Sequence, residues 1–334
     1  MKPASLKKIA LNLLKAFVAI GLLWLIVART GFTTDAFFDV LSKTRPAWFM
    51  ASLPGVLVVL WIKAFRWHLV MKQRDIHFPR QKSFIAYLTS FFIGLLTPGR
   101  FGEIVKVYYI RALPCAGLFK SFQSVIADRF YDLYFLFSAG LVSYLLIFKE
   151  NQPVLFLSVI IAGVLGLLLL WLILRLIKPQ DPSRGFAGFL HGSLSLLTGS
   201  LSLIPWLTTL LAYLAYFFQS WLIARSLGID IGFMSLSAIM TLTSVVLLLP
   251  VTWAGMGTRE FSLVMLMAPY GVASEQALAF SLLQFSSSFL IGGLTGLALW
   301  FRMPIPMQDL KKDYTALQEL FKSRKNKNPS STPH

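Results

Sequence analysis

The segment from Phe84 to Arg111 contains an apolar run that is too short to cross a lipid bilayer. The run extends from Phe84 to Leu96, which is well short of the roughly 20 apolar residues that a transmembrane helix needs. Thr97-Pro98-Gly99 follows, and we expect the helix to break there, because proline removes a backbone donor and glycine relaxes steric limits. Three charged residues come next: Arg100, Glu103 and Lys106. Broken backbone at membrane depth is tolerated only where protein or a wet cavity surrounds it. We therefore predict a re-entrant hairpin over residues 84–111, with charge at its tip.

The rest of the chain carries several apolar stretches of membrane length. Of the 334 residues, 56% are hydrophobic and only 13% are charged, which indicates a polytopic membrane protein with an all-α fold. The predicted spans are Ile9–Ala28, Ala47–Phe65, Phe122–Phe148, Val154–Leu174, Leu203–Ala224 and Ala277–Phe301. The first of them lacks a small-x-small cleavage pattern, so we interpret it as an uncleaved helix rather than a signal peptide.

Lysine and arginine are concentrated in alternate loops. The net charge is +17, and the basic segments are the N-terminus, residues 63–82, residues 175–202 and the tail. The loops at 29–46, 149–153, 225–232 and 271–276 are poor in these residues. The positive-inside rule then puts both termini in the cytoplasm. Because the basic residues are concentrated in alternate loops, we interpret the positive charge as a signal of membrane topology and expect no nucleic-acid partner.

The sides of the membrane on which the chain enters and leaves support the hairpin at residues 84–111. The chain must leave and return on the cytoplasmic side between residues 82 and 122, and two spans would take about 40 residues. A second interrupted segment, 233–270, has Pro250, Gly255 and Gly257 between two short apolar arms. It begins and ends on the outer side. A dip from the outer side and two short tilted spans both return the chain to that side. The chain is therefore predicted to have six full spans plus two hairpins, or eight spans if the second segment crosses the membrane.

The two halves of the chain share one order of elements: span, span, hairpin, span. The second half begins outside, so it repeats the first half upside down. We predict two inverted repeats, residues 1–150 and 151–302, and a basic cytoplasmic tail, residues 303–334. Inverted repeats whose broken helices meet at the midplane are a recurrent plan of transporters.

Charged residues inside or beside apolar segments are the candidates for a functional site. Each costs about 2.5–3.5 kcal/mol at the bilayer centre. Four bases and four acids lie there: Arg100, Lys106, Arg129, Arg259, Glu103, Asp128, Asp132 and Glu260. One interpretation is ion pairing that only fixes the packing of the helices. The other is a binding site, because a broken helix offers free N–H groups and a positive dipole end to an anion, and arginine matches phosphate with a forked donor.

The binding interpretation predicts a site for a phosphate-bearing lipid headgroup. Glycines at the two breaks let a ligand approach the backbone closely, and the two glutamates hold the arginines or accept a proton or an amine. The predicted substrate-binding residues are Thr97, Pro98, Gly99, Arg100, Gly102, Glu103, Lys106, Asp128, Arg129, Asp132, Pro250, Gly255, Gly257, Arg259 and Glu260.

We predict no metal, cofactor or catalytic residue. The single cysteine, Cys115, excludes an intramolecular disulfide, and the four histidines lack ligand spacing. Asp128 and Asp132 share a helix face that suits a divalent ion, but Arg129 and the lack of further oxygen ligands weigh against one.

Three motifs in this order resemble the signatures of the lysylphosphatidylglycerol synthase transmembrane-region family, also called the UPF0104 family. They are LLTPGRFGEIVKVYYIR, SVIADRFYDL and LLLPVTWAGMGTREFSLV. The resemblance covers about residues 10–300. Pro98 to Lys106 fits the family's first motif, Asp128-Arg129 the second, and Pro250 to Glu260 the third.

The resemblance implies a multi-pass protein of a bacterial or archaeal cytoplasmic membrane that handles polar lipids, similar to the flippase half of the multiple-peptide-resistance proteins. We expect a transporter or flippase for an anionic phospholipid or a polyprenyl-phosphate-linked lipid. A membrane-embedded transferase or accessory subunit that acts on such lipids is the alternative, and a small-anion carrier is a third hypothesis. The chain stops soon after the last predicted span, so we expect no soluble aminoacyl-transferase domain and no synthase activity.

Overall fold

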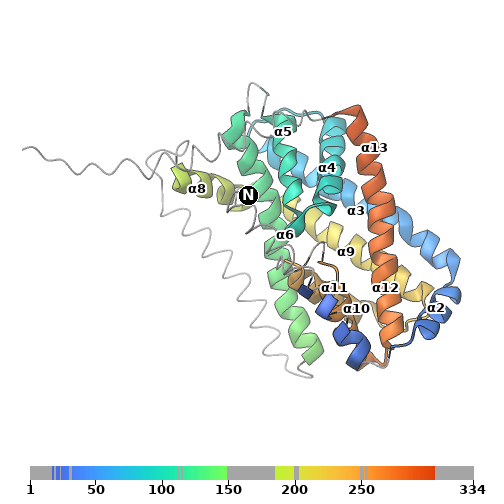
Figure 1. The fold of residues 1–334 in the computed structure, drawn as a ribbon. Coiled ribbons are helices and arrows are strands. Elements are labelled where there is room, and N and C mark those ends of the chain that lie inside the picture. The colour runs from blue at the N-terminus through green and yellow to red at the C-terminus, as the bar shows by residue number, and fades with distance from the viewer. Residues whose placement is uncertain are drawn as a thin grey trace, which may run out of the picture.

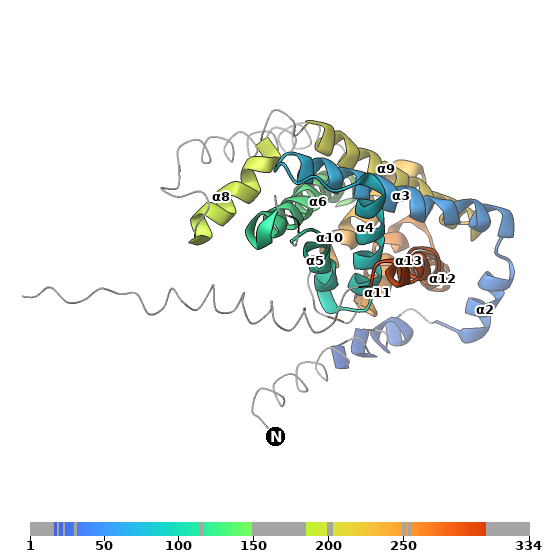
Figure 2. The same ribbon diagram turned by 90° about the horizontal axis from the view of Figure 1, so that it is seen from above.

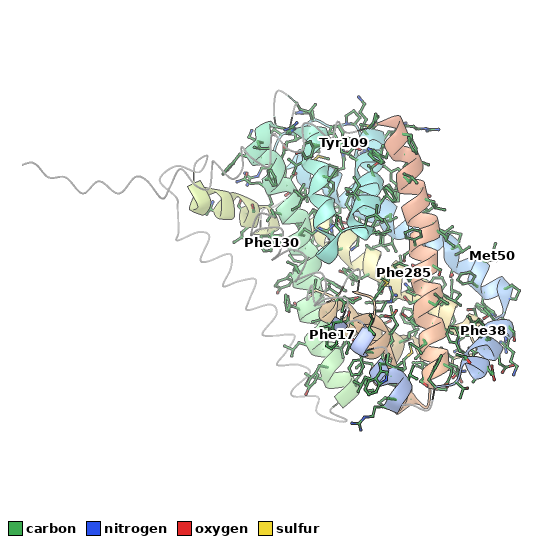
Figure 3. All side chains as sticks on the ribbon, viewed as in Figure 1. Phe17, Phe38, Met50, Tyr109, Phe130 and Phe285 are labelled. Atoms are coloured by element: carbon green, nitrogen blue, oxygen red, sulfur yellow. The ribbon has the colours of Figure 1, made fainter. Side chains whose placement is uncertain are left out.

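A computed structural model describes residues 17–148, 185–198 and 203–304, apart from positions 19, 23, 30, 31, 112, 114, 115, 249–251, 253 and 254. Every regular element within these ranges is helical (Figure 1). The predicted all-α fold is therefore confirmed for the described part of the chain. Large apolar side chains lie on its outside. Phe38 and Met50 are at the periphery in Figure 3 and are 65% and 61% exposed, which suits contact with lipid.

The described helices are α2 (Thr34–Ser42), α3 (Pro46–Lys72), α4 (Arg80–Leu95), η1 (Pro98–Val105), α5 (Lys106–Ile110), α6 (Gly117–Phe148), α8 (Gly185–Thr198), α9 (Leu203–Ser226), α10 (Phe233–Val246), α11 (Thr258–Met267), η4 (Ala268–Tyr270), α12 (Ser274–Ser287), η5 (Ser288–Gly293) and α13 (Leu294–Arg302). Of these, η1 and η4 are 3₁₀-helices, and η5 is a π-helical turn that joins α12 to α13 in one long helix (Figure 1).

Among the described helices, three are long and apolar enough to cross a membrane: α3, α9 and the continuous helix Ser274–Arg302. They contain the predicted spans Ala47–Phe65, Leu203–Ala224 and Ala277–Phe301. A fourth span results if Ile20–Arg29 and α2, which meet at 93°, are taken together. The 32-residue helix α6 contains the predicted span Phe122–Phe148, and Val154–Leu174 lies outside the described residues. The predicted total number of spans stays a prediction.

Helices α3 and α9 lie side by side and antiparallel, as Figure 2 shows from above. The backbone N–H of Arg45 donates to the carbonyl of Ser226 over 2.8 Å at one end of the pair. Gly55 faces Gln219 further along, and Arg66 reaches Thr209 near the other end. These two apolar helices, one from each half of the chain, therefore run in opposite directions.

Both helices end in the same way. A backbone bond from Ile76 to the Met71 carbonyl (3.1 Å) ends α3, and one from Ile229 to the Ala224 carbonyl (3.0 Å) ends α9. Each bond spans five residues, as in a Schellman motif, which needs a left-handed residue just past the helix. Asp75 (φ 58°) takes that position after α3, and Gly228 takes it after α9.

The chain reverses direction between α4 and α5. Gly102 lies against the carbonyl of Ile93, and the side chain of Glu103 lies against Gly94. The hydroxyl of Thr97 accepts a hydrogen bond of 2.8 Å from the Gly102 N–H, which closes the turn. Because α4 ends at Leu95 and a 3₁₀-helix begins at Pro98, the predicted helix break is confirmed.

The short helices of each half pack against the last long helix of the other half. Val245 of α10 lies against Gly140 of α6, and Leu88 of α4 lies against Gly296 of α13. In Figure 1, α4 and α5 occupy the upper half of the molecule, and α10 and α11 occupy the lower half.

Three segments differ from their predictions. Helix α3 continues past Phe65 to Lys72, because residues 61–72 contain neither glycine nor proline, so Lys63 and Arg66 belong to the helix and not to a basic loop. Helices α2 and α8 lie within residues 29–46 and 175–202, for which the charge pattern predicts loops. Thr33 caps α2 by accepting a hydrogen bond from the Ala36 N–H (3.3 Å).

Candidate functional site

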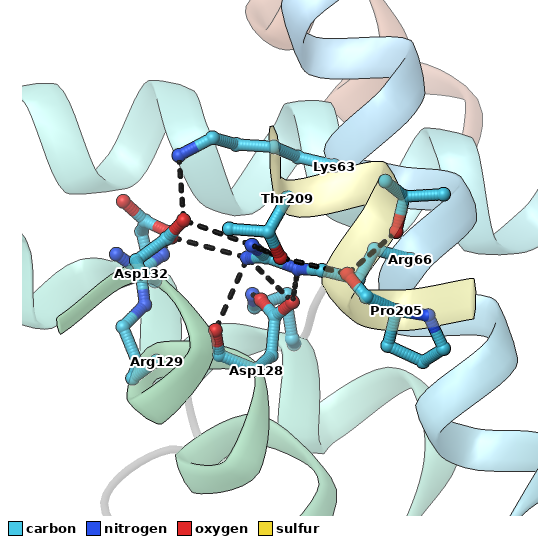
Figure 4. A network of polar contacts seen from close by, with 10 residues as sticks. Lys63, Arg66, Asp128, Arg129, Asp132, Pro205 and Thr209 are labelled. Carbon is cyan, nitrogen blue, oxygen red and sulfur yellow. Dashed lines mark hydrogen bonds and ion pairs between the residues drawn. The ribbon is translucent and has the colours of Figure 1, made fainter. Parts of the chain in front are cut away.

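Arg66 is the centre of a buried charge network between α3, α6 and α9 (Figure 4). Its Nε donates to Asp128 Oδ1 (2.9 Å), and its Nη1 donates to Asp132 Oδ1 (2.9 Å) and to the Thr209 hydroxyl (3.0 Å). Its Nη2 donates to Asp132 Oδ2 and to the Asp128 carbonyl, both over 3.1 Å. A guanidinium has five N–H donors, so Arg66 is fully used within the protein.

Asp128 lies between two cations. Its Oδ2 is 2.8 Å from Lys106 Nζ, on the opposite side from Arg66. The Lys106 ammonium also lies 4.3 Å from the centre of the Tyr87 ring and 5.4 Å from that of Trp67, where ring quadrupoles attract a cation. Arg66, Lys106 and Asp128 are all completely buried. At the core of the network, these three buried side chains therefore pair with one another away from solvent.

Lys63 and Arg129 form the exposed edge of the network. Lys63 Nζ is 3.0 Å from Asp132 Oδ1 and 4.8 Å from the centre of the Tyr213 ring. Arg129 is paired with Glu103 of η1. The side chains of Lys63 and Arg129 are 18% and 31% exposed, whereas that of Arg66 is inaccessible. A ligand from outside would therefore meet Lys63 and Arg129 first.

Helical spacing creates this arrangement. Lys63 and Arg66 are three residues apart on α3, and Asp128 and Asp132 are four apart on α6, so each pair lines one helix face. Glu103 approaches α6 because Gly94 leaves room for it: a Cβ at Gly94 would lie 2.8 Å from Glu103 Cγ. A glycine on α4 is therefore a requirement of the Glu103–Arg129 pair.

Among the described side chains, the network has one positive charge in excess. Four basic side chains face three acidic ones: Lys63, Arg66, Lys106 and Arg129 against Glu103, Asp128 and Asp132. Charges taken out of water are costly unless they are paired and hydrogen-bonded. An anion at the edge of the network would neutralise the excess, so the electrostatics favour a negatively charged ligand.

A second charged group surrounds Arg259 in α11. Arg259 donates to Glu260 Oε1 from Nε and Nη2 (3.1 and 2.6 Å), and to the Ser281 hydroxyl of α12 (2.7 Å). Its guanidinium lies 4.7 Å from the centre of the Phe285 ring. Glu260 Oε2 accepts a hydrogen bond from the Gly257 N–H at the start of α11 (2.6 Å). Gly257 and Gly255 have φ of 83° and 76°, a backbone region that favours glycine.

The structure brings together five of the predicted binding residues, Glu103, Lys106, Asp128, Arg129 and Asp132, in one network. Arg259 and Glu260 form a separate group with Gly257, and no hydrogen bond or ion pair among the described side chains joins the two groups. Thr97 and Gly102 close the turn of the first motif, and Gly255 precedes α11. Pro98, Gly99 and Arg100 begin η1, but their side chains lie outside what the structure describes, as does Pro250.

Three residues of the network were missing from the predicted site: Lys63, Arg66 and Thr209. The first two were assigned to a loop because lysine and arginine near the end of an apolar run usually mark one. Their i, i+3 spacing within an unbroken helical segment is a signal for a shared buried face. Thr209 lies in an apolar run with no such signal.

Together, the apolar helices and the buried charge network define the chain as a multi-pass helical membrane protein with ionisable groups in its interior. The chain belongs to the family of the lysylphosphatidylglycerol synthase TM region, whose model matches residues 12–296. Neither a curated protein nor a solved structure matches the chain.

Proposed function

We propose that the protein is a lipid transporter that binds the phosphate of a lipid headgroup at the exposed edge of the Arg66 network. The observation that carries this proposal is the excess positive charge of a network enclosed by apolar helices. Ionisable residues in such a place are expensive and usually functional. Membership of a family named after a lipid synthase's membrane region agrees with a lipid ligand. An anionic phospholipid or a polyprenyl-phosphate-linked lipid supplies both a phosphate and apolar chains.

The residues divide into those that position and those that bind. Arg66 and Lys106 are buried and occupied by aspartates, so they hold α3, α5 and α6 in place. Lys63 uses one of its three N–H donors on Asp132. The remaining two donate to none of the described residues, and in this proposal they bind phosphate oxygens together with the Arg129 guanidinium, which is also paired with Glu103. Arg100 and Arg259 at the two breaks would contact the phosphate at other stages of its passage.

Movement of the lipid headgroup would depend on two inverted repeats, residues 1–150 and 151–302. The antiparallel course of α3 and α9 and their matching ends support this division. So does the reciprocal packing of α4 on α13 and of α10 on α6. In this proposal the segments at 84–111 and 233–270 are re-entrant hairpins from opposite sides, and rocking of one repeat against the other exposes the headgroup alternately. The protein would lie in the cytoplasmic membrane with both termini inside.

The test is lipid movement by purified protein in liposomes. Acyl-labelled anionic phospholipid, polyprenyl phosphate and phosphatidylcholine are each included, and a membrane-impermeant quencher reports the label that reaches the outer leaflet. We expect faster movement of at least one phosphate-bearing anionic lipid than in protein-free liposomes. Product formation from a lipid and a donor without lipid movement would favour a transferase, and uptake of free phosphate alone would favour an anion carrier.

The charged breaks are tested in the same assay. Arg100→Ala and Arg259→Ala are each expected to abolish transport with little loss of folded protein, because each removes a forked phosphate donor. Arg225→Ala is the control, since Arg225 is paired with the exposed Asp230. Full transport by both Arg100→Ala and Arg259→Ala would contradict the role given to the breaks.

A further inference from the structure

The side-chain amide of Gln284 in α12 is buried and lacks a hydrogen-bond partner among the described residues. It is only 5% exposed, and neither its amide oxygen nor its amide nitrogen has a partner among the described residues. Native proteins rarely leave buried polar atoms in this state, because an unsatisfied donor or acceptor loses its water without compensation. A bound group that both donates and accepts hydrogen bonds would satisfy both ends of this side chain.

Other polar groups gather around Gln284. Gln219 of α9 is 2% exposed and donates to the Ser287 hydroxyl over 3.2 Å. Ser287 is one turn beyond Gln284, and its hydroxyl donates to the backbone carbonyl of Gln284 over 3.0 Å. The π-helical turn η5 begins directly after Ser287, and such turns are frequent at functional sites. We call Gln219, Gln284 and Ser287 the neutral cluster.

The neutral cluster is adjacent to the Arg259 group. Ser281, which accepts a hydrogen bond from Arg259 Nε (2.7 Å), is three residues before Gln284 on α12. Residues at this spacing lie about 5–6 Å apart on one helix face, which is about the length of a small alcohol esterified to a phosphate. The Nη1 of Arg259 donates to none of the described residues. A phosphate at Arg259 would thus place the group esterified to it near Gln284.

The neutral cluster has a charged counterpart in the other half of the chain. The Arg66 network joins α3 to α6, and the neutral cluster joins α9 to α12, the helices in the same order of the second half. Along α9, Thr209 and Gln219 are ten residues apart, which is about 15 Å of helix and about half of the hydrocarbon thickness. The two polar groups therefore lie at different positions along α9.

We propose that the neutral cluster is a second station for the lipid headgroup, where Gln284 and Gln219 bind an uncharged hydroxyl or amide group while Arg259 holds the phosphate. The proposal rests on the proposed transport function and deepens it, because it makes the transporter selective for headgroups that carry a hydrogen-bonding group beyond the phosphate. A headgroup with only a methyl ester would leave both ends of the Gln284 amide without a partner.

The experiment compares two lipids of equal charge. Phosphatidylglycerol and phosphatidylmethanol both carry one phosphodiester, but only the first has hydroxyl groups beyond it. In the liposome assay, the wild-type protein should move labelled phosphatidylglycerol about ten-fold faster than labelled phosphatidylmethanol, since about one net hydrogen bond separates them. Gln284→Leu should slow phosphatidylglycerol to the rate of phosphatidylmethanol and leave the latter unchanged. Gln276→Leu, the same change at the start of the same helix, should alter neither rate.

The outcomes separate this inference from the proposed function. Equal wild-type rates for the two lipids overturn the second station and leave transport itself intact. A Gln284→Leu protein that still moves phosphatidylmethanol at the wild-type rate is folded, and a preserved preference for phosphatidylglycerol in it also overturns the station. If the wild-type protein moves neither these lipids nor any other phosphate-bearing lipid, the proposed function is wrong, and the station is wrong with it.

Discussion

At the scale of single residues, Asp128 is a central acid of the Arg66 network. It is completely buried, and it is shared by Arg66 and Lys106. Removing one partner of a buried ion pair leaves an uncompensated charge, which costs far more than the pair contributes. Here two buried cations would lose the same partner.

We therefore predict that Asp128→Asn lowers the free energy of unfolding by about 3–5 kcal/mol, or prevents folding. The measurement is thermal unfolding in a single detergent, followed by tryptophan fluorescence. Asp230→Asn is the matched control, because its ion pair with Arg225 is largely exposed and exposed pairs contribute little. Equal unfolding midpoints for Asp128→Asn and the wild type would show that the network does not stabilise the fold.

At the scale of elements, glycines set the distance between packed helices. Small residues let helix backbones approach closely inside membranes. A Cβ at Gly296 of α13 would overlap the backbone carbonyl oxygen of Leu88, whereas one at Gly140 would lie 2.9 Å from the side-chain atom Val245 Cγ2. A backbone atom cannot rotate away, but a valine methyl group can.

The two crossings should consequently respond differently to alanine. Gly296→Ala should lower the free energy of unfolding by about 1–3 kcal/mol, Gly140→Ala should lower it less, and Gly232→Ala should leave it nearly unchanged. Gly232 has open space around it and an ordinary φ of −59°. The order of the three unfolding midpoints is the readout, and a larger loss at Gly232 than at Gly296 would contradict the packing described here.

The sequence allowed the helix break at Pro98 to be predicted, but not the end of α3. Proline and glycine act locally, so the helix break between α4 and α5 follows from a few adjacent residues. Helix α3 was predicted to stop at Phe65 because the charges of Lys63 and Arg66 resemble those of a cytoplasmic loop. Their partners, Asp128 and Asp132, lie more than 60 residues away. The pairing depends on tertiary contacts that no local pattern contains.

At the scale of the whole molecule, the two halves are interlocked by the reciprocal packing of α4 on α13 and of α10 on α6. The start of α2 is also tied to the start of α12, because the Thr33 N–H donates to Glu275 Oε1 over 3.2 Å. The starts of α4 and α6 lie at the opposite end of the molecule in Figure 1. This arrangement gives a definite expectation for which residues share one face of the membrane.

Single cysteines in a Cys115→Ser background test that expectation. Lys82→Cys and Lys120→Cys flank the segment that reverses direction, and both positions are exposed. An impermeant maleimide should label both from the cytoplasmic side, and it should label Asp35→Cys and Ala273→Cys from the other side. Labelling of Lys82→Cys and Lys120→Cys from opposite sides would mean that the segment crosses the membrane instead of returning.

Transport as proposed depends most on one contact, that of a lipid phosphate with the exposed edge of the Arg66 network. Lys63→Met removes the edge ammonium and keeps most of the side-chain volume, and Lys43→Met makes the same change at a lysine that is largely exposed. The initial rate of anionic-lipid movement in liposomes should fall about ten-fold for Lys63→Met, as the loss of one charged hydrogen bond to phosphate requires, and should stay at the wild-type value for Lys43→Met. An unchanged rate for folded Lys63→Met would contradict the account.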